Sequence, residues 1–452
     1  MSVLSLLQLR LRESVGKFRF TRIAGEASWI MVGQIAAATG GIVGVPLLTH
    51  LMRPEEYGRL ALGSTLMILI QQVIMGPIGI AVQRFYSPSV EAKTLSEYLR
   101  AVASIILMAT GVIAACGAVA MMVLSATRWH GSMHLMAWSM TFAIFSGFHI
   151  VFDGIQNAGR QRLIVAWHQG LGMWLRFGMA ALLVKTFGGA EMAMAGFAAA
   201  NAITLFSQIF FFRRIVLASP AYKPEHSNEE IGKLRRQMWV YSRSVSSWGL
   251  FTWAQFTSDR WALQAFTTTR AVGLYQAVYQ LGYYPISMAS TFLNQLVQPI
   301  LFQRAGAGTD EARIRNTYRM VNVLFLACIA LTFVGTLTAA LICKPLFHHL
   351  LPPAYSAEAY LLPVIACAAG VYAAGQVASL KHSLTVNPQS LIAPKIVTAV
   401  LGTGLNFGGA YLYGTPGVIW ANLIFSTIYT LWVVAATPSL ASGLPGNAAA
   451  AS

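Results

Sequence analysis

Apolar stretches of about 20 residues, separated by short polar turns, run through almost the whole chain. A helix rises about 1.5 Å per residue, so roughly 20 residues cross the ~30 Å hydrocarbon core of a bilayer. Lipid offers no partner to an unpaired backbone group, so each stretch is expected to be a membrane-spanning helix. The pattern predicts twelve such helices, near residues 28–49, 58–82, 99–125, 134–158, 163–187, 190–212, 239–266, 272–298, 319–342, 358–380, 391–413 and 415–436.

A polar, charged segment at residues 213–238 separates the first six predicted helices from the last six. A local pattern recurs on its two sides: LTHLMRPEEYGRLAL follows the first helix, and LQAFTTTRAVGLYQAV follows the seventh. Each copy ends its polar turn with a bulky residue and a glycine, Tyr57-Gly58 and Val272-Gly273. Six crossings is an even number, so the two halves are expected to have the same orientation, as parallel repeats do.

The sequence therefore predicts an all-α polytopic membrane protein. Two six-helix lobes, related by a parallel pseudo-two-fold axis, would face one central cavity. The expected division is a cytoplasmic basic tail, an N-lobe, a cytoplasmic linker, a C-lobe and a second cytoplasmic tail, at residues 1–27, 28–212, 213–238, 239–436 and 437–452.

Composition and charge support this interpretation. The 452 residues are 56% hydrophobic and only 10% charged, whereas soluble chains have roughly 25% charged residues. The net charge of +16 alone would also fit a nucleic-acid-binding protein. However, most lysines and arginines fall in segments that become cytoplasmic when the N-terminus is inside, as membrane topology requires. We therefore expect both termini in the cytoplasm, no nucleic-acid partner, and a basic amphipathic tail at residues 1–27 instead of a cleaved signal peptide.

Sequence motifs for soluble catalysis are absent. The chain has no GxxxxGK[ST] and no HExxH, so neither ATP nor a catalytic metal is predicted. The four cysteines lie in or at the ends of predicted helices without paired spacing, which favours small apolar packing residues over disulfides or metal ligands. The outer turns are too short for a catalytic domain. We expect a protein that is not an enzyme and has no cofactor, driven by a gradient, the membrane potential or a concentration drop.

Several basic residues nevertheless lie within predicted helices. A charge in lipid costs at least ~2.5–3.5 kcal/mol, so such groups are expected to face a protein interior or a wet cavity. Arg176 lies in the middle of the fifth helix, and Arg260 in the outer third of the seventh. Guanidinium groups can replace the hydration of a phosphate with paired hydrogen bonds. We predict a basic lining for an anionic headgroup, made by Arg176 and Arg260 with help from Arg243, Lys395 and Gln255; alternatively, each basic residue pairs locally or extends to the interface.

Acidic and histidine side chains in the helices are candidates for coupling or gating. His149 and Asp153 are four residues apart, so they share a helix face, and His168 is expected at a similar depth. These three residues could form a proton-sensitive cluster, or a neutral hydrogen-bonded packing group. Asp259 is a candidate gate or ion site, or else a structural counter-charge to an arginine of a neighbouring helix. Glu26 is a further coupling candidate, or it neutralises a nearby arginine.

Three stretches resemble a known family. The segment Leu48–Leu62 is similar to the turn that opens the Wzx-type polysaccharide flippases, and Thr257–Tyr279 (TSDRWALQAFTTTRAVGLYQAVY) resembles their second-lobe signature. Gln298-Pro299 matches the residues that often end their eighth helix. These flippases belong to the superfamily that also contains the MATE multidrug exporters. The resemblance implies a MATE-like fold and a location in the bacterial inner membrane.

The resemblance also implies a function, namely transfer of undecaprenyl-pyrophosphate-linked oligosaccharide units from the cytoplasmic to the periplasmic leaflet by alternating access. The implied partners are membrane lipids, H⁺ or Na⁺, and a polymerase or other polysaccharide assembly proteins. A MATE-like cation or drug antiporter is one alternative, but it would favour an acidic cavity. A membrane polysaccharide polymerase or ligase is another, but the largest outer segment, Cys343–Ala357, has only about fifteen residues.

Overall fold

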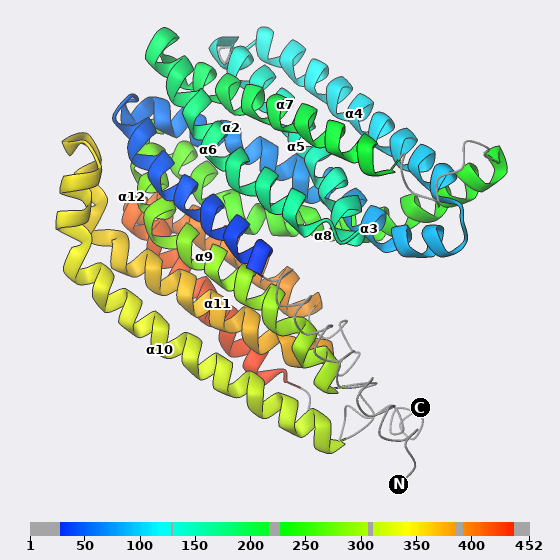
Figure 1. Ribbon diagram of the computed structural model, residues 1–452. Coiled ribbons are helices and arrows are strands. Elements are labelled where there is room, and N and C mark those ends of the chain that lie inside the picture. Colours follow the sequence, from blue (N-terminus) through cyan, green and yellow to red (C-terminus); the bar gives the residue numbers. More distant parts are fainter. Residues whose placement is uncertain (1–27, 128–129, 217–226, 306–310, 385–391, 438–452) are drawn as a thin grey trace.

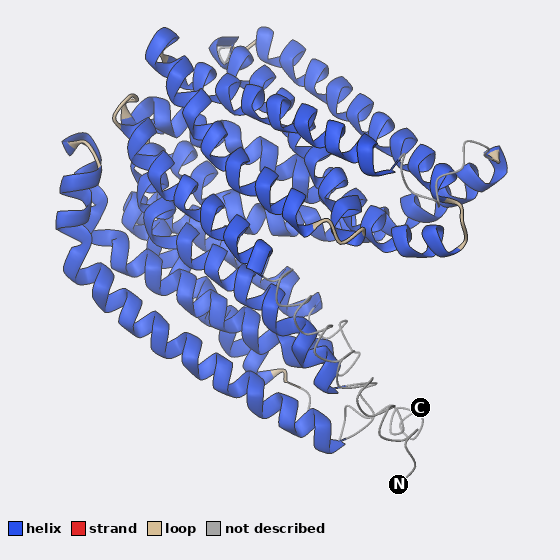
Figure 2. Ribbon diagram, viewed as in Figure 1, coloured by secondary structure: helices blue, strands red, loops and turns tan. Residues whose placement is uncertain are grey.

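The computed structural model describes residues 28–127, 130–216, 227–305, 311–384 and 392–437. Within these ranges the regular elements are helices, and no strand is present (Figure 2). Glu26 and the rest of the tail at residues 1–27 lie outside the described part of the chain. The elements are a first helix Ser28–Thr49, α2 Pro54–Ile70, η1 Gln71–Met75, α3 Gly76–Glu91, α4 Leu95–Ser125, η2 His130–Ser132, α5 Met133–Ala158, α6 Arg162–Phe187, α7 Gly189–Val216, α8 Asn228–Phe266, α9 Thr269–Ala305, α10 Glu311–Leu350, η3 Pro353–Leu361, α11 Leu362–Leu384 and α12 Ile392–Ala435.

These helices account for the twelve predicted crossings. Among the described residues, eight continuous helical segments have the length and apolar composition of a membrane span. Three more helices, α6, α8 and α9, are long enough but more polar, and all three line the cavities described below. The last of the eight segments, α12, is interrupted at Gly414, whose φ of 62° favours glycine, so α12 has two arms. The expected all-α polytopic fold is thereby confirmed.

Helix α8 begins earlier than the hydrophobic pattern predicts. The Ser227 side chain accepts a hydrogen bond from the backbone N–H of Glu230 (3.5 Å), and Glu229 and Glu230 occupy the first turn. A capping serine and negative charges both stabilise a helix N-terminus. Residues 228–238 therefore extend the helix into the segment that the sequence pattern assigns to a linker.

The helices form two groups, α2–α7 and α9–α12, which lie close together at the left of Figure 1 and spread apart toward the right. The connections at residues 50–53 and 267–268 lie where the groups meet, and we call this the far end; the opposite end is the near end. Helix α8 contacts both groups. Ser242 of α8 donates to the carbonyl of Pro77 in α3 (3.4 Å), and Ser258 of α8 accepts from Asn406 in α12 (2.9 Å).

The apolar cores show how the two groups are joined. One large core spans both groups at the far end and includes Tyr57 of α2, Tyr275 of α9 and Tyr355 of η3. The Tyr57 and Tyr355 rings meet edge to face, with centroids 6.0 Å apart. Toward the near end the groups have separate cores, one around Tyr98 in the first group and two, around Val321 and around Tyr429, in the second. Apolar burial therefore closes the far end, and the described residues form no shared core at the near end.

The recurring glycines lie at the point of closest contact between the two groups. A Cβ added to Gly58 of α2 would lie 2.0 Å from the carbonyl oxygen of Thr269, and one added to Gly273 of α9 would lie 1.9 Å from that of Pro54. Real Cβ atoms do not approach an oxygen so closely, so only glycine allows the two backbones to cross here. The repeat in the sequence thus corresponds to a symmetric helix crossing at the far end.

Candidate functional site

A central cavity of about 380 Å³ lies between the two groups of helices. The first helix, α2, η1, α5 and α6 form one wall, and α8 and α9 form the other. Its polar lining includes Ser64, Gln72, Arg176, Arg260, Gln276 and Gln280. Among the described residues, the charged side chains in this lining are the two arginines, and no carboxylate lines it. The two arginines come from opposite walls, as the predicted basic lining requires.

Arg176 of α6 has no ionic partner among the described residues. Its Nη2 donates to Oδ1 of Asn201 (3.3 Å), its guanidinium carbon lies 5.0 Å from the centre of the Phe142 ring, and its buried Nε has no hydrogen-bond partner. An orphaned donor on a buried cation carries an energetic cost that an anionic ligand can relieve. Arg176 also borders a second cavity, so it connects two polar spaces.

Arg260 of α8 is held much more firmly. Its Nη1 donates to Oδ1 of the neighbouring Asp259 (2.9 Å) and to the carbonyl of Phe256 (2.9 Å), while its Nε donates to Oε1 of Gln276 (2.8 Å). The guanidinium carbon lies 4.4 Å from the centre of the Tyr279 ring. Asp259 also accepts a short hydrogen bond from the Tyr275 hydroxyl. Asp259 therefore pairs with the next residue of its own helix, whereas the sequence suggested an arginine of a neighbouring helix.

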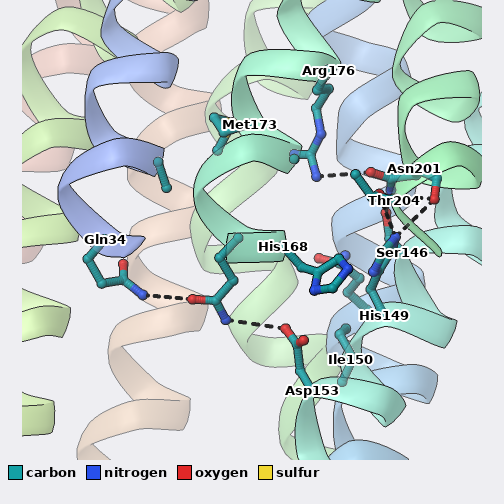
Figure 3. Close-up of a pocket in the computed structure, with 14 residues that line it drawn as sticks. Gln34, Ser146, His149, Ile150, Asp153, His168, Met173, Arg176, Asn201 and Thr204 are labelled. Atoms are coloured by element: carbon teal, nitrogen blue, oxygen red, sulfur yellow. Dashed lines mark hydrogen bonds between the residues drawn. The ribbon is translucent and has the colours of Figure 1, made fainter. Parts of the chain in front are cut away.

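The second cavity, of about 270 Å³, lies within the first group of helices and contains a chain of hydrogen bonds (Figure 3). Gln34 of the first helix donates to Gln169 of α6 (3.2 Å), which donates to Oδ2 of Asp153 in α5 (3.2 Å). Gln208 of α7 donates to Oδ1 of Asp153 (2.7 Å) and accepts from Nδ1 of His149 (2.6 Å). Asp153 and His149 are thus linked through Gln208, and the chain joins three transmembrane helices to the first one.

The other ring nitrogen of His149 has two possible partners. Its Nε2 lies 2.9 Å from the carbonyl oxygen of Asn201 and 3.0 Å from the Thr204 hydroxyl. A neutral ring can accept from the hydroxyl at this nitrogen, and a protonated ring can donate to the carbonyl. Because Asn201 also holds Arg176, a change at His149 would act next to the arginine that lines the central cavity. His168 lines the same cavity but bonds to Ile164 and Ser207 instead.

A third cavity, of about 300 Å³, lies within the second group. It is bounded by α8, α9, α11 and the start of α12, and it shares Phe256 and Ser287 with the central cavity. Hydroxyl, amide and aromatic side chains dominate its lining, and its charged lining residue among those described is Lys395. Gln255 donates to the Tyr372 hydroxyl across this cavity (3.2 Å).

A comparison with family models decides the family. The model described as "Polysaccharide biosynthesis protein" matches residues 23–305, which is more than half of the chain. The chain belongs to this family. No curated protein matches the sequence. The predicted resemblance to a family of polysaccharide assembly is therefore confirmed.

Solved structures resemble this polysaccharide biosynthesis protein in fold. Lipid II flippase MurJ, in an inward closed conformation, is 11% identical with a TM-score of 0.66, and the match covers 90% of this chain and 86% of that one. The MATE multidrug transporter DinF-BH is 14% identical with a TM-score of 0.62, covering 91% and 94% of the two chains. A mutant of VcmN, a MATE transporter of Vibrio cholerae, is 14% identical with a TM-score of 0.61, covering 91% and 97%. At these identities the likeness establishes the fold alone, and that fold is the MATE-like one expected from the sequence.

The structure distributes the predicted site residues over three places. Arg176 and Arg260 meet at the central cavity, with Asp259 behind Arg260. His149, Asp153 and His168 gather at the cavity of the first group, and Gln255 and Lys395 at that of the second. Arg243 is exposed on α8 and lines none of these three cavities. Glu26 is outside the described residues.

Some residues in or beside these cavities were not predicted as site residues. Gln208 connects Asp153 to His149 from behind the cavity of the first group, and Tyr372 lines the cavity of the second group and bonds to Gln255. A glutamine inside an apolar helix is itself a signal, because its amide needs partners that lipid does not supply. Tyr372 gives no such signal, since tyrosine is common in membrane helices.

Proposed function

We propose that the protein is a flippase that moves an undecaprenyl-pyrophosphate-linked oligosaccharide from the cytoplasmic to the periplasmic leaflet by alternating access. The observation that carries this proposal is the central cavity, to which Arg176 and Arg260 contribute from opposite walls and whose described lining contains no carboxylate. A pyrophosphate must lose its water to cross the membrane. Hydrogen bonds to charged groups contribute about 1.5–3 kcal/mol each, so two guanidinium groups can offset a large part of that loss.

The same cavity disfavours a cation exporter. An organic cation would meet the positive charge of Arg176 there, which has no ionic partner in the described part of the chain, and like charges in a region of low dielectric repel strongly. Asp259 offsets the charge of Arg260, but its carboxylate is 3% exposed and already bonded to Arg260 and Tyr275, so it is not free to bind a cation. Arg176 keeps a full positive charge without an ionic partner among the described residues.

The arrangement of the cores supports a state that is open toward the cytoplasm. With both termini placed inside by the distribution of basic residues, the near end is cytoplasmic and the far end periplasmic. The shared core and the glycine crossing close the far end, and the separate cores at the near end allow the two groups to stand apart. A headgroup would then enter from the inner leaflet, and it would leave on the periplasmic side after helices α2 and α9 separate at their crossing.

Coupling is assigned to the hydrogen-bond chain of the first group. Gln208 donates to Asp153 and accepts from His149, so a change in the protonation of either group alters the hydrogen bond to the other, and His149 contacts the residue that holds Arg176. Movement of H⁺ would in this way be linked to the position of the headgroup arginine. Asp259 serves in this proposal as the gate residue, since breaking its ion pair with Arg260 would free the guanidinium group to bind the headgroup. Na⁺ is the alternative coupling ion, and the experiment below distinguishes it from H⁺.

The test uses the full-length protein in vesicles loaded with lipid-linked oligosaccharide extracted from cells that lack the protein. A glycan-cleaving enzyme outside the vesicles reports how much substrate reaches the outer leaflet, with and without a pH or Na⁺ gradient. Wild type is expected to move the substrate, and Arg176→Ala to lose most of that activity, with Arg214→Ala as the control at an exposed position of α7. Movement no faster than in protein-free vesicles, together with efflux of a cationic dye, would identify an exporter. Formation of longer glycans would identify a polymerase.

A further inference from the structure

The cavity of the second group differs chemically from the other two. The central cavity is lined by two arginines, and the cavity of the first group contains Asp153, two histidines and Arg176. The cavity of the second group is lined by neutral hydroxyl and amide groups and by aromatic rings, with Lys395 as its charged residue. Resting on the proposed function, we propose that this cavity is the binding site for the sugar rings of the glycan, while the pyrophosphate lies on Arg176 and Arg260.

Amide oxygens that can accept hydrogen bonds are the first support for this assignment. Oδ1 of Asn294 is buried and has no partner. Gln255 and Gln376 donate through their amide nitrogens to Tyr372 and Tyr429 (3.2 and 3.1 Å), so each also carries an amide oxygen that can act as an acceptor. A cavity wall with such acceptors calls for a ligand rich in donors. Sugar hydroxyls donate and accept, whereas a phosphate oxygen only accepts and would be repelled by these atoms.

Aromatic side chains provide the second support. The Tyr372 ring packs edge to face on Phe256, with centroids 6.0 Å apart, and tilted on Tyr429 at 5.0 Å. Phe256 and Tyr372 both line the cavity, so one wall is apolar and rigid. A pyranose ring has hydroxyls around its edge and C–H groups on its faces. The combination of amide acceptors with an aromatic wall fits both features of such a ring.

The connection to the central cavity is the third support. Phe256 and Ser287 line both cavities, and the carbonyl of Phe256 accepts a hydrogen bond from Arg260 (2.9 Å). A ligand whose charged part lies at Arg260 can therefore extend its neutral part into the next cavity without leaving the protein. The volume of about 300 Å³ equals on the order of ten water molecules, which is space for a sugar ring and not for a long glycan.

A double variant tests the assignment. Gln255→Met with Tyr372→Phe removes both partners of one hydrogen bond and keeps the volumes similar, a change that is close to neutral for folding. The matched control is Tyr411→Phe, the same chemical change at a tyrosine that is 71% exposed on α12. Transport is measured in vesicles with two substrates, namely the lipid-linked oligosaccharide from cells lacking the protein and undecaprenyl pyrophosphate, the same lipid without any sugar.

The expected result is a difference between substrates. Relative to wild type, the double variant should slow the full oligosaccharide at least about tenfold more than the sugar-free lipid, since the hydrogen bonds of Gln255 and Tyr372 to a sugar are lost only with the former. The control should behave like wild type with both substrates. Equal slowing of both substrates, or slowing of neither, would overturn the assignment of the glycan site. If wild type moves neither substrate, the flippase proposal itself fails, and the two failures are thereby distinguished.

Discussion

Substitution of Gly58 by alanine should open the far end of the molecule. The added Cβ would lie 2.0 Å from the carbonyl oxygen of Thr269, which is a backbone atom and cannot rotate away. Helices α2 and α9 must therefore separate. Overpacking of this kind typically costs about 1–3 kcal/mol. The clash exists only in the state that is closed at the far end, so the cost destabilises that state. The population of molecules open at the far end then rises by roughly 5- to 150-fold.

The ion pair that also crosses this end is expected to contribute little by comparison. Arg270 and Glu55 are 3.1 Å apart, but their side chains are 53% and 44% exposed. Exposed pairs contribute about 0–1 kcal/mol. The magnitudes therefore assign the closure to the glycine crossing, and Glu55→Gln should change the opening far less than Gly58→Ala.

Access to the central cavity measures this opening. Ser64 lines that cavity on α2, so Ser64→Cys is introduced as a reporter after the native cysteines are replaced, namely Cys116, Cys328, Cys343 and Cys367. A thiol reagent that does not cross membranes is added on the periplasmic side. Gly58→Ala should speed the labelling of the reporter by about fivefold or more. The control is Gly111→Ala in α4, where a Cβ meets no atom within 4 Å.

Two outcomes would refute the reasoning about this crossing. Unchanged labelling with Gly58→Ala would mean that the glycine contact does not hold the far end closed. Equal acceleration by Gly111→Ala would mean that the helices respond to any added methyl group. Gly273→Ala provides an internal check, because it disturbs the same crossing from α9 and should not add its full effect to that of Gly58→Ala.

Three further predictions follow from the described contacts. Asp259→Asn leaves the buried Arg260 without its counter-charge, which should destabilise the protein by about 3–5 kcal/mol and lower its melting temperature in detergent; an unchanged melting temperature would show that the pair is dispensable. Asp153→Asn keeps an acceptor for Gln208 but removes the charge, so vesicle transport should lose its dependence on a pH gradient while protein levels stay normal; retained dependence would exclude this carboxylate from coupling. Gly414→Ala places a Cβ on a residue with φ of 62°, which should cost about 1–3 kcal/mol in thermal unfolding, whereas the helical Gly404→Ala should not be destabilising.

The sequence by itself determined the architecture of this protein. Hydrophobic stretches long enough for a bilayer fixed the all-α fold and the number of crossings, because lipid allows the backbone few other structures. The repeat around Gly58 and Gly273 predicted two related halves, and the structure shows that these glycines meet where helices α2 and α9 cross. The position of Arg176 inside an apolar helix predicted a buried cation near a cavity, and it lines the central one.

Only the tertiary structure decided which of these groups are partners. Asp259 and Arg260 are neighbours in the chain, yet the sequence could not show that they pair with each other, while Arg176 has no acidic partner in the part of the chain that the structure describes. Asp153 and Gln208 are 55 positions apart, and their hydrogen bond exists because α5 and α7 pack side by side. Helical periodicity places a side chain on a face of its own helix, but the rotation and depth of neighbouring helices determine what that face meets. The separation of a cationic central cavity from a neutral one beside it is likewise a product of packing.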